Sequence, residues 1–218
     1  MRGSAVAGVL CALALLLATG ASGRDPGLEK LQLRAADVAL AKRITLRQQD
    51  VGASWGAIRI PNGSGERLVC PGFSPNFSRF TISGKASSGF TRTGGASILS
   101  SVEVYESRAD AIGDFRMGAK PIVANCLKRS LERQLKASPL VKVSVPFARV
   151  VAAPPVGDRR IAYRIVARLE AATTQLDVYL DVVVVQRGRS IAALFFTGPK
   201  QSLPGQAQIA SSVAARMR

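Results

Sequence analysis

A stretch near the C-terminal end has the clearest hydrophobic pattern in the chain, and it predicts three consecutive antiparallel strands. Apolar and polar residues alternate over 160–169 and again over 176–185, a period of two that is typical of strands with one buried face. The segment 191–197 is short, apolar and rich in residues that favour strands. Between the last two segments, residues 187–190 (Arg-Gly-Arg-Ser) fit a two-residue hairpin turn with glycine at its first central position. The rest of the chain is expected to be organised around this sheet.

The register of these strands follows from matching their apolar and charged positions. A shift by one residue would lose both matches, because successive side chains point to opposite faces of a sheet. The predicted pairs in the first hairpin are Leu169–Leu176, Ile165–Leu180, Tyr163–Val182, Ile161–Val184, Arg168–Asp177 and Arg164–Asp181. Those in the second are Arg187–Ser190, Val184–Ala193 and Val182–Phe195.

The predicted sheet has two unequal faces. One is continuously apolar and is expected to be the core, covered by two helices with apolar stripes. These stripes are Leu127, Leu131 and Leu135 in one helix and Ile209 and Val213 in the other. The opposite face carries four candidate ligand-binding residues, Arg164, Arg168, Asp177 and Asp181. Two interpretations are open for these four residues: ion pairs in contact with solvent, which stabilise little, or the floor of a polar cleft.

The remaining pattern predicts one α+β domain with a largely antiparallel twisted sheet, and with a long kinked helix and a C-terminal helix packed on one face. The long helix begins after Ser107, a good N-cap, and is kinked or restarted at Pro121. The other expected elements are a helix over 28–44, strands over 79–91, 96–105 and 141–152, and a last helix opened by Pro204.

The N-terminus indicates export. Residues 1–23 have the charged start, the apolar run and the small-residue cleavage site of a signal peptide, which leaves 24–218 as a single exported domain. The apolar run is too short to span a membrane comfortably. Cys11 lies inside this run and not just after it, so no lipid anchor is expected. The sequence therefore predicts a secreted or periplasmic protein.

Charge points to anionic partners. The chain has 30 Lys and Arg against 14 Asp and Glu, a formal net charge of +16. Such a domain attracts an anionic envelope polymer or lipid, whereas export argues against a nucleic acid partner. The clearest basic patch is Arg129, Arg133 and Lys136, opposite the leucine stripe of the long helix. It is either an ordinary solvated helix face or a polyanion site.

Export also bears on the cysteines. Removal of the signal peptide leaves Cys70 and Cys126, and two cysteines in an oxidising compartment most often pair. A disulfide would tie the flank of the long helix to the loop that precedes the sheet. The alternative is two separate buried thiols.

Missing residue types argue against an enzyme. The chain has no histidine, which removes Ser-His and Cys-His nucleophiles and histidine metal ligands, and it has no phosphate-binding glycine motif. No cofactor or metal site is expected. A carboxylate hydrolase would need a free acid pair, and the arginines opposite Asp177 and Asp181 should keep both carboxyls ionised.

Several short motifs carry a resemblance to known proteins. They are Asp50-x-Gly52-x-x-Trp55, Cys70-x-Gly72-Phe73, the Ser-Val-Glu-Val-Tyr-Glu-Ser run at 101–107, Cys126-Leu127 in a helix, and the valine-rich strands that follow. In this order they resemble secreted actinobacterial proteins of unknown function. More distantly, they resemble the extracellular sensor domains of mycobacterial receptor kinases and the PsbP-like fold. The resemblance implies ligand sensing by a disulfide-bonded sheet with a cleft.

These observations favour an exported, non-enzymatic ligand-binding or sensor-like module of the cell envelope, which engages an anionic or amphipathic ligand. The alternative is a cell-envelope assembly or scaffolding protein that binds an envelope protein through a sheet face. An exposed apolar patch around Val183, Leu194 and Phe196 would favour that alternative.

Overall fold

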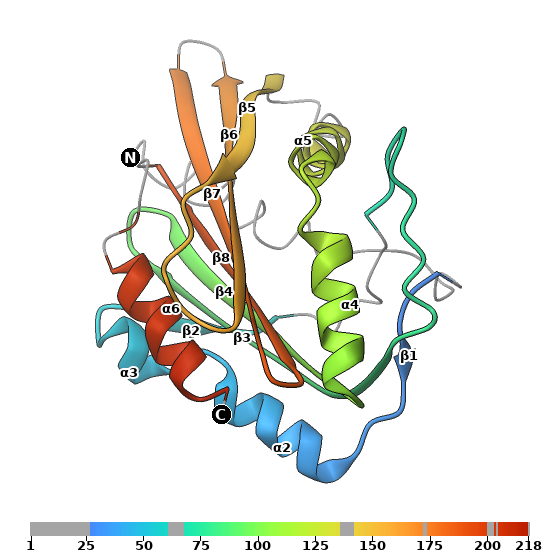
Figure 1. Ribbon diagram of the computed structural model, residues 1–218. Coiled ribbons are helices and arrows are strands. Elements are labelled where there is room, and N and C mark those ends of the chain that lie inside the picture. Colours follow the sequence, from blue (N-terminus) through green and yellow to red (C-terminus); the bar gives the residue numbers. More distant parts are fainter. Residues whose placement is uncertain are drawn as a thin grey trace.

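The computed structural model describes residues 27–60, 68–135, 142–171, 174–199, 203 and 205–217. Within these ranges the chain forms an eight-stranded sheet in the order β1-β3-β4-β8-β7-β6-β5, with β2 paired to β3 (Figure 1). The pairs are antiparallel except β1–β3, so the predicted α+β class and largely antiparallel sheet are confirmed. The strands are β1 (Lys30–Leu31), β2 (Gly56–Ile58), β3 (Thr81–Arg92), β4 (Ala96–Tyr105), β5 (Lys142–Val151), β6 (Arg159–Ala171), β7 (Thr174–Arg187) and β8 (Ser190–Gly198). The helices are α2 (Ala35–Ile44), α3 (Gln48–Val51), α4 (Arg108–Gly118), α5 (Ile122–Leu135) and α6 (Gln206–Ala215).

The registers predicted for the central hairpins are confirmed. In β6 and β7, Leu169 pairs with Leu176, and the other five predicted pairs follow in the same alignment. In β7 and β8, Arg187 pairs with Ser190, and Gly188 has the positive φ of 55° that a tight hairpin turn requires.

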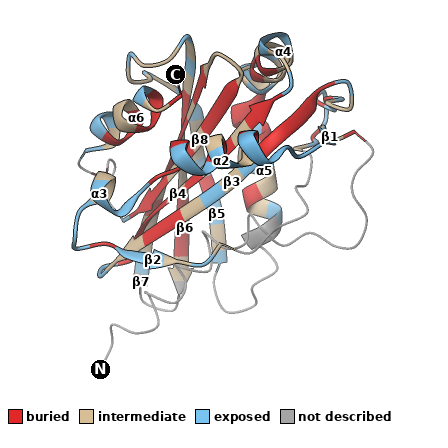
Figure 2. Ribbon diagram, turned by 90° about the horizontal axis from the view of Figure 1, so that it is seen from below, coloured by how far each residue is buried: buried red, intermediate tan, exposed pale blue. Residues whose placement is uncertain are grey.

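Both faces of the sheet are covered, each over its own hydrophobic core. On one face, the α5 core joins α5 to alternate residues of β6 and β7, among them Leu131, Tyr163, Ile165, Val178 and Leu180. On the other face, the α6 core joins α2 and α6 to the intervening residues of the strands, among them Ile209, Val213, Val183, Leu194 and Phe196. Figure 1 shows α6 on the opposite side of the sheet from α4 and α5. Figure 2 shows the buried residues concentrated in the strands between these layers.

The expectation that the long helix and the C-terminal helix pack on one face is therefore wrong for α6. Residues 182–185 of β7 are all valine, and β8 is also apolar at successive positions, so both faces of this part of the sheet must be removed from water. α5 covers one face and α6 covers the other. Leu127 and Leu131 take their predicted place in the α5 core, while the side chain of Leu135 lies outside the described residues.

The helix predicted over 28–44 begins only at Ala35. The preceding residues run along the edge of β3. There the amides of Lys30, Gln32 and Arg34 donate to the carbonyls of residues 80, 82 and 83 at 2.8, 3.0 and 2.8 Å. Backbone hydrogen bonds at an open sheet edge thus override the helical spacing of a few leucines. α2 itself lies close on β3, since a Cβ on Gly84 would come within 2.2 Å of the Asp37 carbonyl oxygen.

The long helix is two helices, α4 and α5, separated at Pro121. Ser107 is the N-cap of α4, and its side chain accepts a hydrogen bond from the Asp110 amide at 3.0 Å. The Cys70–Cys126 disulfide is present, with a Cα–Cα distance of 5.5 Å, and it ties the loop before β3 to α5. No helix among the described residues is long and apolar enough to cross a membrane. The predicted signal peptide, 1–23, lies outside the described residues.

Candidate functional site

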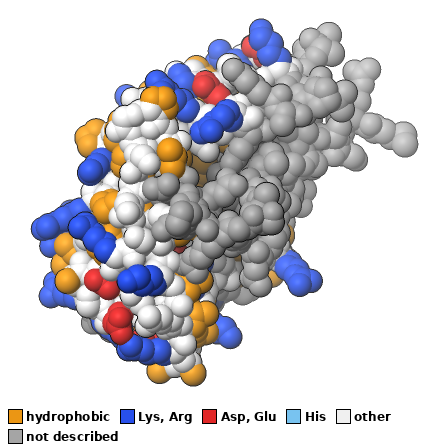
Figure 3. Space-filling model, turned by 90° about the vertical axis from the view of Figure 1, so that its right-hand side faces the viewer, with side chains coloured by type: hydrophobic (Ala, Val, Ile, Leu, Met, Phe, Trp, Pro, Cys, Tyr) orange, Lys and Arg blue, Asp and Glu red, His pale blue; other side chains and the backbone are white. Residues whose placement is uncertain are grey.

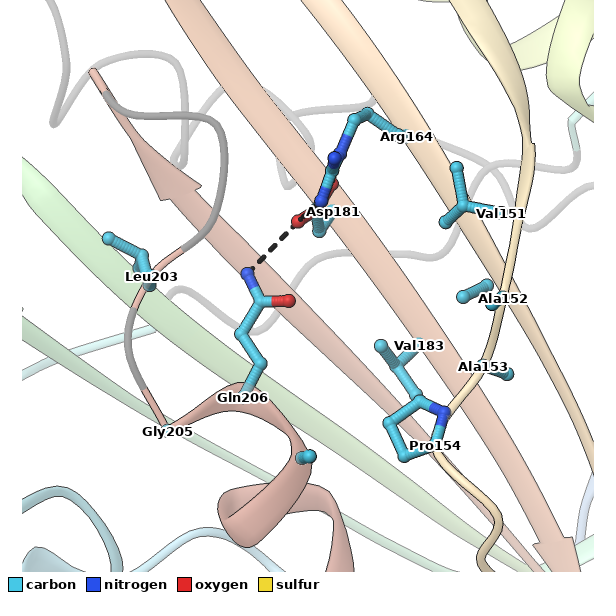
Figure 4. A pocket seen from close by; sticks show the side chains of 12 residues that line it. Val151, Ala152, Ala153, Pro154, Arg164, Asp181, Val183, Leu203, Gly205 and Gln206 are labelled. Carbon is cyan, nitrogen blue, oxygen red and sulfur yellow. Dashed lines mark hydrogen bonds and ion pairs between the residues drawn. The ribbon is translucent and has the colours of Figure 1, made fainter.

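Arg164 and Asp181 form a buried ion pair between β6 and β7, on the face that α6 covers. The Arg164 Nε and Nη2 atoms donate to the two carboxylate oxygens of Asp181 at 2.7 and 2.8 Å. Their side chains are only 17% and 5% exposed. A third group, the Gln206 side-chain amide of α6, donates to Asp181 at 3.0 Å (Figure 4). The hydrogen bonds to Asp181 raise the pKa of Arg164 above its ordinary value.

A hollow of about 530 Å³ opens above this pair, and we call it the α6 groove. One wall is the end of β5 and the loop that follows it, and the other is the start of α6. Its polar lining residues are Arg164, Asp181 and Gln206; the remaining lining residues are Val151, Ala152, Ala153, Pro154, Ala162, Val183, Leu203, Gly205 and Ala207. Figure 4 shows the side chains of Val183 and Pro154 facing Gln206 across the groove. The groove is thus a mainly apolar slot with a polar floor.

Local sequence explains both walls. The chain turns away from the sheet after Val151 through a turn in which the Val156 amide donates to the Pro154 carbonyl at 2.8 Å. On the other side, Gly205 is the N-cap residue of α6. It has a φ of 83° and no side chain that could cap the helix. The first amides of α6, at Gln206 and Ala207, therefore border the groove without a capping side chain, and the positive end of the helix dipole lies there.

Arg168 and Asp177 form the second predicted pair, and this pair lies at the surface. Its two hydrogen bonds, 2.8 and 3.1 Å long, match those of the first pair, but the side chains are 37% and 31% exposed. Hydrogen bonding to Arg168 lowers the pKa of Asp177 below its ordinary value. Neither residue lines the α6 groove. Arg164–Asp181 thus lies in the floor of the mainly apolar α6 groove, whereas Arg168–Asp177 is an ion pair in contact with solvent.

The predicted basic patch borders a second hollow on the α5 side of the sheet. Arg129 and Arg133 line a space of about 630 Å³ with Glu132, Val69, Cys70 and Pro71, next to the disulfide. The Arg133 side chain reaches the Val69 carbonyl at 3.5 Å. Lys136, the third predicted member, lies outside the described residues. Figure 3 shows Lys and Arg side chains spread over this side of the molecule, with few acidic side chains among them.

The most perturbed carboxyl group is one that sequence reasoning did not single out as a site. Asp114 lies on the side of α4 that faces β4, where burial raises its pKa to about 7. The charges of Glu103 and Glu29 add to this rise in pKa, and the hydrogen bond from Tyr105 opposes it. Asp114 lines neither hollow. Within the described part of the chain, no group of three or more acidic or cysteine side chains is arranged to hold a metal ion.

The sequence also did not predict the residues that form the walls of the α6 groove. Leu203, Gln206 and the 151–154 segment carry no motif, and they meet only because α6 returns to the sheet beside the end of β5. One pattern in the sequence could have indicated these walls: β7 and β8 are apolar on both faces, so a second helix must cover the second face.

Comparisons with known proteins give little. No protein-family model and no curated protein sequence matches the chain. Among solved structures, the extracellular domain of PknH from Mycobacterium tuberculosis is similar, with a TM-score of 0.40 and 10% sequence identity over 85% of this chain and 97% of that one. A TM-score of this size assigns neither a family nor a function.

Proposed function

We propose that this protein is an exported, non-enzymatic binding module, and that its ligand is a small amphipathic molecule held in the α6 groove by an apolar body and an anionic end. The observation that carries the proposal is the groove itself, a mostly apolar slot of about 530 Å³ with an arginine in its floor. Small-molecule sites commonly combine this size, an apolar lining and a few polar groups that fix orientation.

The polar groups of the groove favour an anionic end. Arg164 uses Nε and Nη2 to bind Asp181, and its Nη1 has no partner among the described residues. The uncapped start of α6 adds amides and a partial positive charge at the same place. Because Asp181 already accepts three hydrogen bonds, a carboxylate or phosphate would meet donors and not a free acidic group. The ion pair is neutral overall, so the apolar walls must supply most of the affinity.

The same residues weigh against the other functions. A carboxylate hydrolase needs a free acid pair, and both Asp177 and Asp181 are held by an arginine through two hydrogen bonds. A scaffold that docks through the sheet face needs exposed apolar side chains there. Val183, Leu194 and Phe196 are 3%, 0% and 1% exposed, because α2 and α6 cover them.

The test is to measure the binding of dodecanoate by calorimetry, at concentrations below those at which it forms micelles. The variant Ala207→Phe places a ring at the mouth of the groove, and Ala215→Phe adds the same ring at the exposed far end of α6 as a matched control. Wild type and Ala215→Phe should bind dodecanoate alike, and Ala207→Phe should bind at least about tenfold more weakly, as expected when a small-molecule site is filled.

Dodecyltrimethylammonium, with the same chain and the opposite charge, tests the anionic end and should bind more weakly than dodecanoate. Equal binding of the two amphiphiles would remove the anionic part of the proposal. Unchanged dodecanoate binding by Ala207→Phe, or no binding by wild type, would overturn the α6 groove as an amphiphile site.

A further inference from the structure

Helix α4 is fastened to the sheet by polar contacts at every fourth residue. The Thr81 amide donates to Asp110 at 3.4 Å, the Tyr105 hydroxyl lies 2.5 Å from an Asp114 oxygen, and the Tyr163 hydroxyl donates to the Gly118 carbonyl at 2.6 Å. Residues spaced by four lie on one side of a helix, here the side that faces the sheet. Asp114 is the middle contact, and it lines neither of the two hollows.

The Tyr105 hydroxyl lies between two carboxyl groups. Besides the Asp114 oxygen, it lies 3.1 Å from Oε2 of Glu103, and the Tyr105 residue is completely buried. A hydroxyl carries one hydrogen and can donate to only one of two carboxylates. If both acids were ionised, one of these two contacts would join oxygens with no hydrogen between them, next to two like charges in a buried place.

A proton on Asp114 satisfies every atom in this arrangement. The Asp114 hydroxyl then donates to the Tyr105 oxygen, and the Tyr105 hydroxyl donates to Glu103. The proton is placed on Asp114 and not on Glu103 because Glu103 has a cation beside it: Lys85 of β3 forms an ion pair with it at 3.1 Å. At 2.5 Å, the contact between the Asp114 and Tyr105 oxygens is short enough that a hydrogen must lie between them.

The charged groups around Asp114 act in the same direction. On β4 it faces Glu103 and Tyr105, and Glu29, in the segment before β1, adds a second acid. On its own helix, Asp110 lies one turn earlier. The nearest cation on β3 is Lys85, which is bound to Glu103, and no ion pair joins Asp114 to a lysine or arginine of the described ranges. Burial first, and then Glu103 and Glu29, raise the pKa of Asp114 to about 7, although the hydrogen bond with Tyr105 acts against the rise.

We infer that Asp114, Tyr105 and Glu103 form a proton-binding site that holds α4 against the sheet when the proton is bound and loosens it when the proton leaves. The site is independent of the α6 groove. Its folded form binds the proton more tightly than the unfolded chain does, so stability should rise as pH falls through the midpoint of the site. At alkaline pH, the Asp114 and Glu103 carboxylates share one hydroxyl hydrogen, and the middle contact of α4 is weakened.

The composition of the chain makes this site unusually easy to observe. There is no histidine, and Cys70 and Cys126 are joined in a disulfide. No other side chain of ordinary pKa titrates between about pH 6 and pH 8, a range otherwise left to the terminal amino group. A titration step in this range that is lost on changing Asp114 is therefore assigned directly.

The experiment is a carbon-13 NMR titration of the side-chain carboxyls of the wild-type protein, with thermal unfolding measured over the same pH range. The Asp114 carboxyl should titrate with a midpoint near pH 7, about three pH units above an ordinary aspartate. The melting temperature should fall as pH rises from about 4 to that midpoint and should level off above it. Amides of α4 should exchange faster on the alkaline side, after correction for intrinsic exchange.

Two variants separate the site from its surroundings. Asp114→Asn should remove this step, the fall in melting temperature between about pH 4 and pH 7, whereas Asp110→Asn, on the same helix, should keep it. An Asp114 midpoint below about pH 5 in the wild-type spectrum would overturn the inference, even if Asp114→Asn failed to fold. A step that persists in Asp114→Asn would also overturn it, because the proton would then bind elsewhere.

Discussion

Two arginine–aspartate pairs lie four residues apart on the same two strands, and they have the same chemistry and different environments. Arg164–Asp181 and Arg168–Asp177 each have two hydrogen bonds in the same cross-strand register. The start of α6 lies over the first pair, whose aspartate is 5% exposed, and leaves the second pair open, with its aspartate 31% exposed. Side chains that are equivalent in the strands thus lie in different environments because of a helix whose contact residue, Gln206, follows Asp181 by 25 residues.

The difference matters because burial changes what an ion pair contributes. A surface pair gains little, since water and salt screen the charges and two long side chains lose freedom. A buried pair has lost its hydration, so removing one partner leaves a charge that neither water nor protein compensates. The two pairs in this sheet provide both cases in one molecule.

The largest expected effect is the loss of Asp181. Asp181→Ala should lower the free energy of unfolding by about 3 kcal/mol, because it leaves Arg164 desolvated and unpaired. Asp177→Ala removes the same group from the exposed pair and should leave the stability almost unchanged. Urea unfolding of the two variants measures both. Equal losses would show that α6 does not set the two pairs apart.

Replacing the whole buried pair is the control for this result. The double variant Arg164→Met, Asp181→Leu should recover much of the stability lost in Asp181→Ala, because no charge is left without a partner. If the double variant were no more stable than Asp181→Ala, the loss of stability would come from altered packing and not from an unpaired charge.

An intermediate effect is expected for Gln206, the residue through which α6 contacts the buried pair. Gln206→Ala removes one hydrogen bond to Asp181 and should cost about 1 kcal/mol of unfolding free energy. Gln208→Ala is the matched control, since Gln208 is an exposed glutamine on the same helix. If the two variants lost the same stability, helix propensity alone would explain the effect.

The smallest effect concerns acid pH and the exposed pair. The pKa of Asp177 is lowered in the folded state by its hydrogen bonds to Arg168, so the folded chain binds this proton more weakly than the unfolded chain. The contribution of Asp177 is therefore present above the ordinary aspartate pKa, and it is lost as pH falls through the lowered value. Asp177→Asn should lose slightly less stability than wild type when the pH is lowered from about 5 to about 3. Identical losses would mean that the pair has no energetic coupling in solution.

The strand pairing of the central sheet was predictable from sequence, for a physical reason. In β6 and β7, period-two alternation and two opposite charge matches leave one alignment, because any one-residue slip exchanges the two faces. The N-cap at Ser107, the break at Pro121 and the Cys70–Cys126 disulfide rest on equally local signals.

The α6 groove was only half predictable. Alternation in a strand tells which residues share a face, so Arg164 and Asp181 were found as candidates. It does not tell which helix covers that face, and Leu203 and the 151–154 segment have no pattern of their own. The parallel pairing of β1 was missed for a similar reason, since an edge-strand contact depends on a distant partner. The proton site at Asp114 depends on Tyr105 and Glu103 from another element, and spacing within α4 could not reveal it.

The disulfide determines where a protease can cut the chain once without dividing it into two separate molecules. The bond between Cys70 and Cys126 closes a covalent ring that contains β3, β4 and α4, while β5 to β8 lie on a linear arm beyond it. A protease that cuts once inside the ring leaves every strand attached to one molecule, held through sulfur. A single cut in the arm after Cys126 separates the chain into two pieces that only the sheet keeps together. Strands β3 and β4, between Cys70 and Cys126, are thus the part of the sheet in which a single cut does least harm.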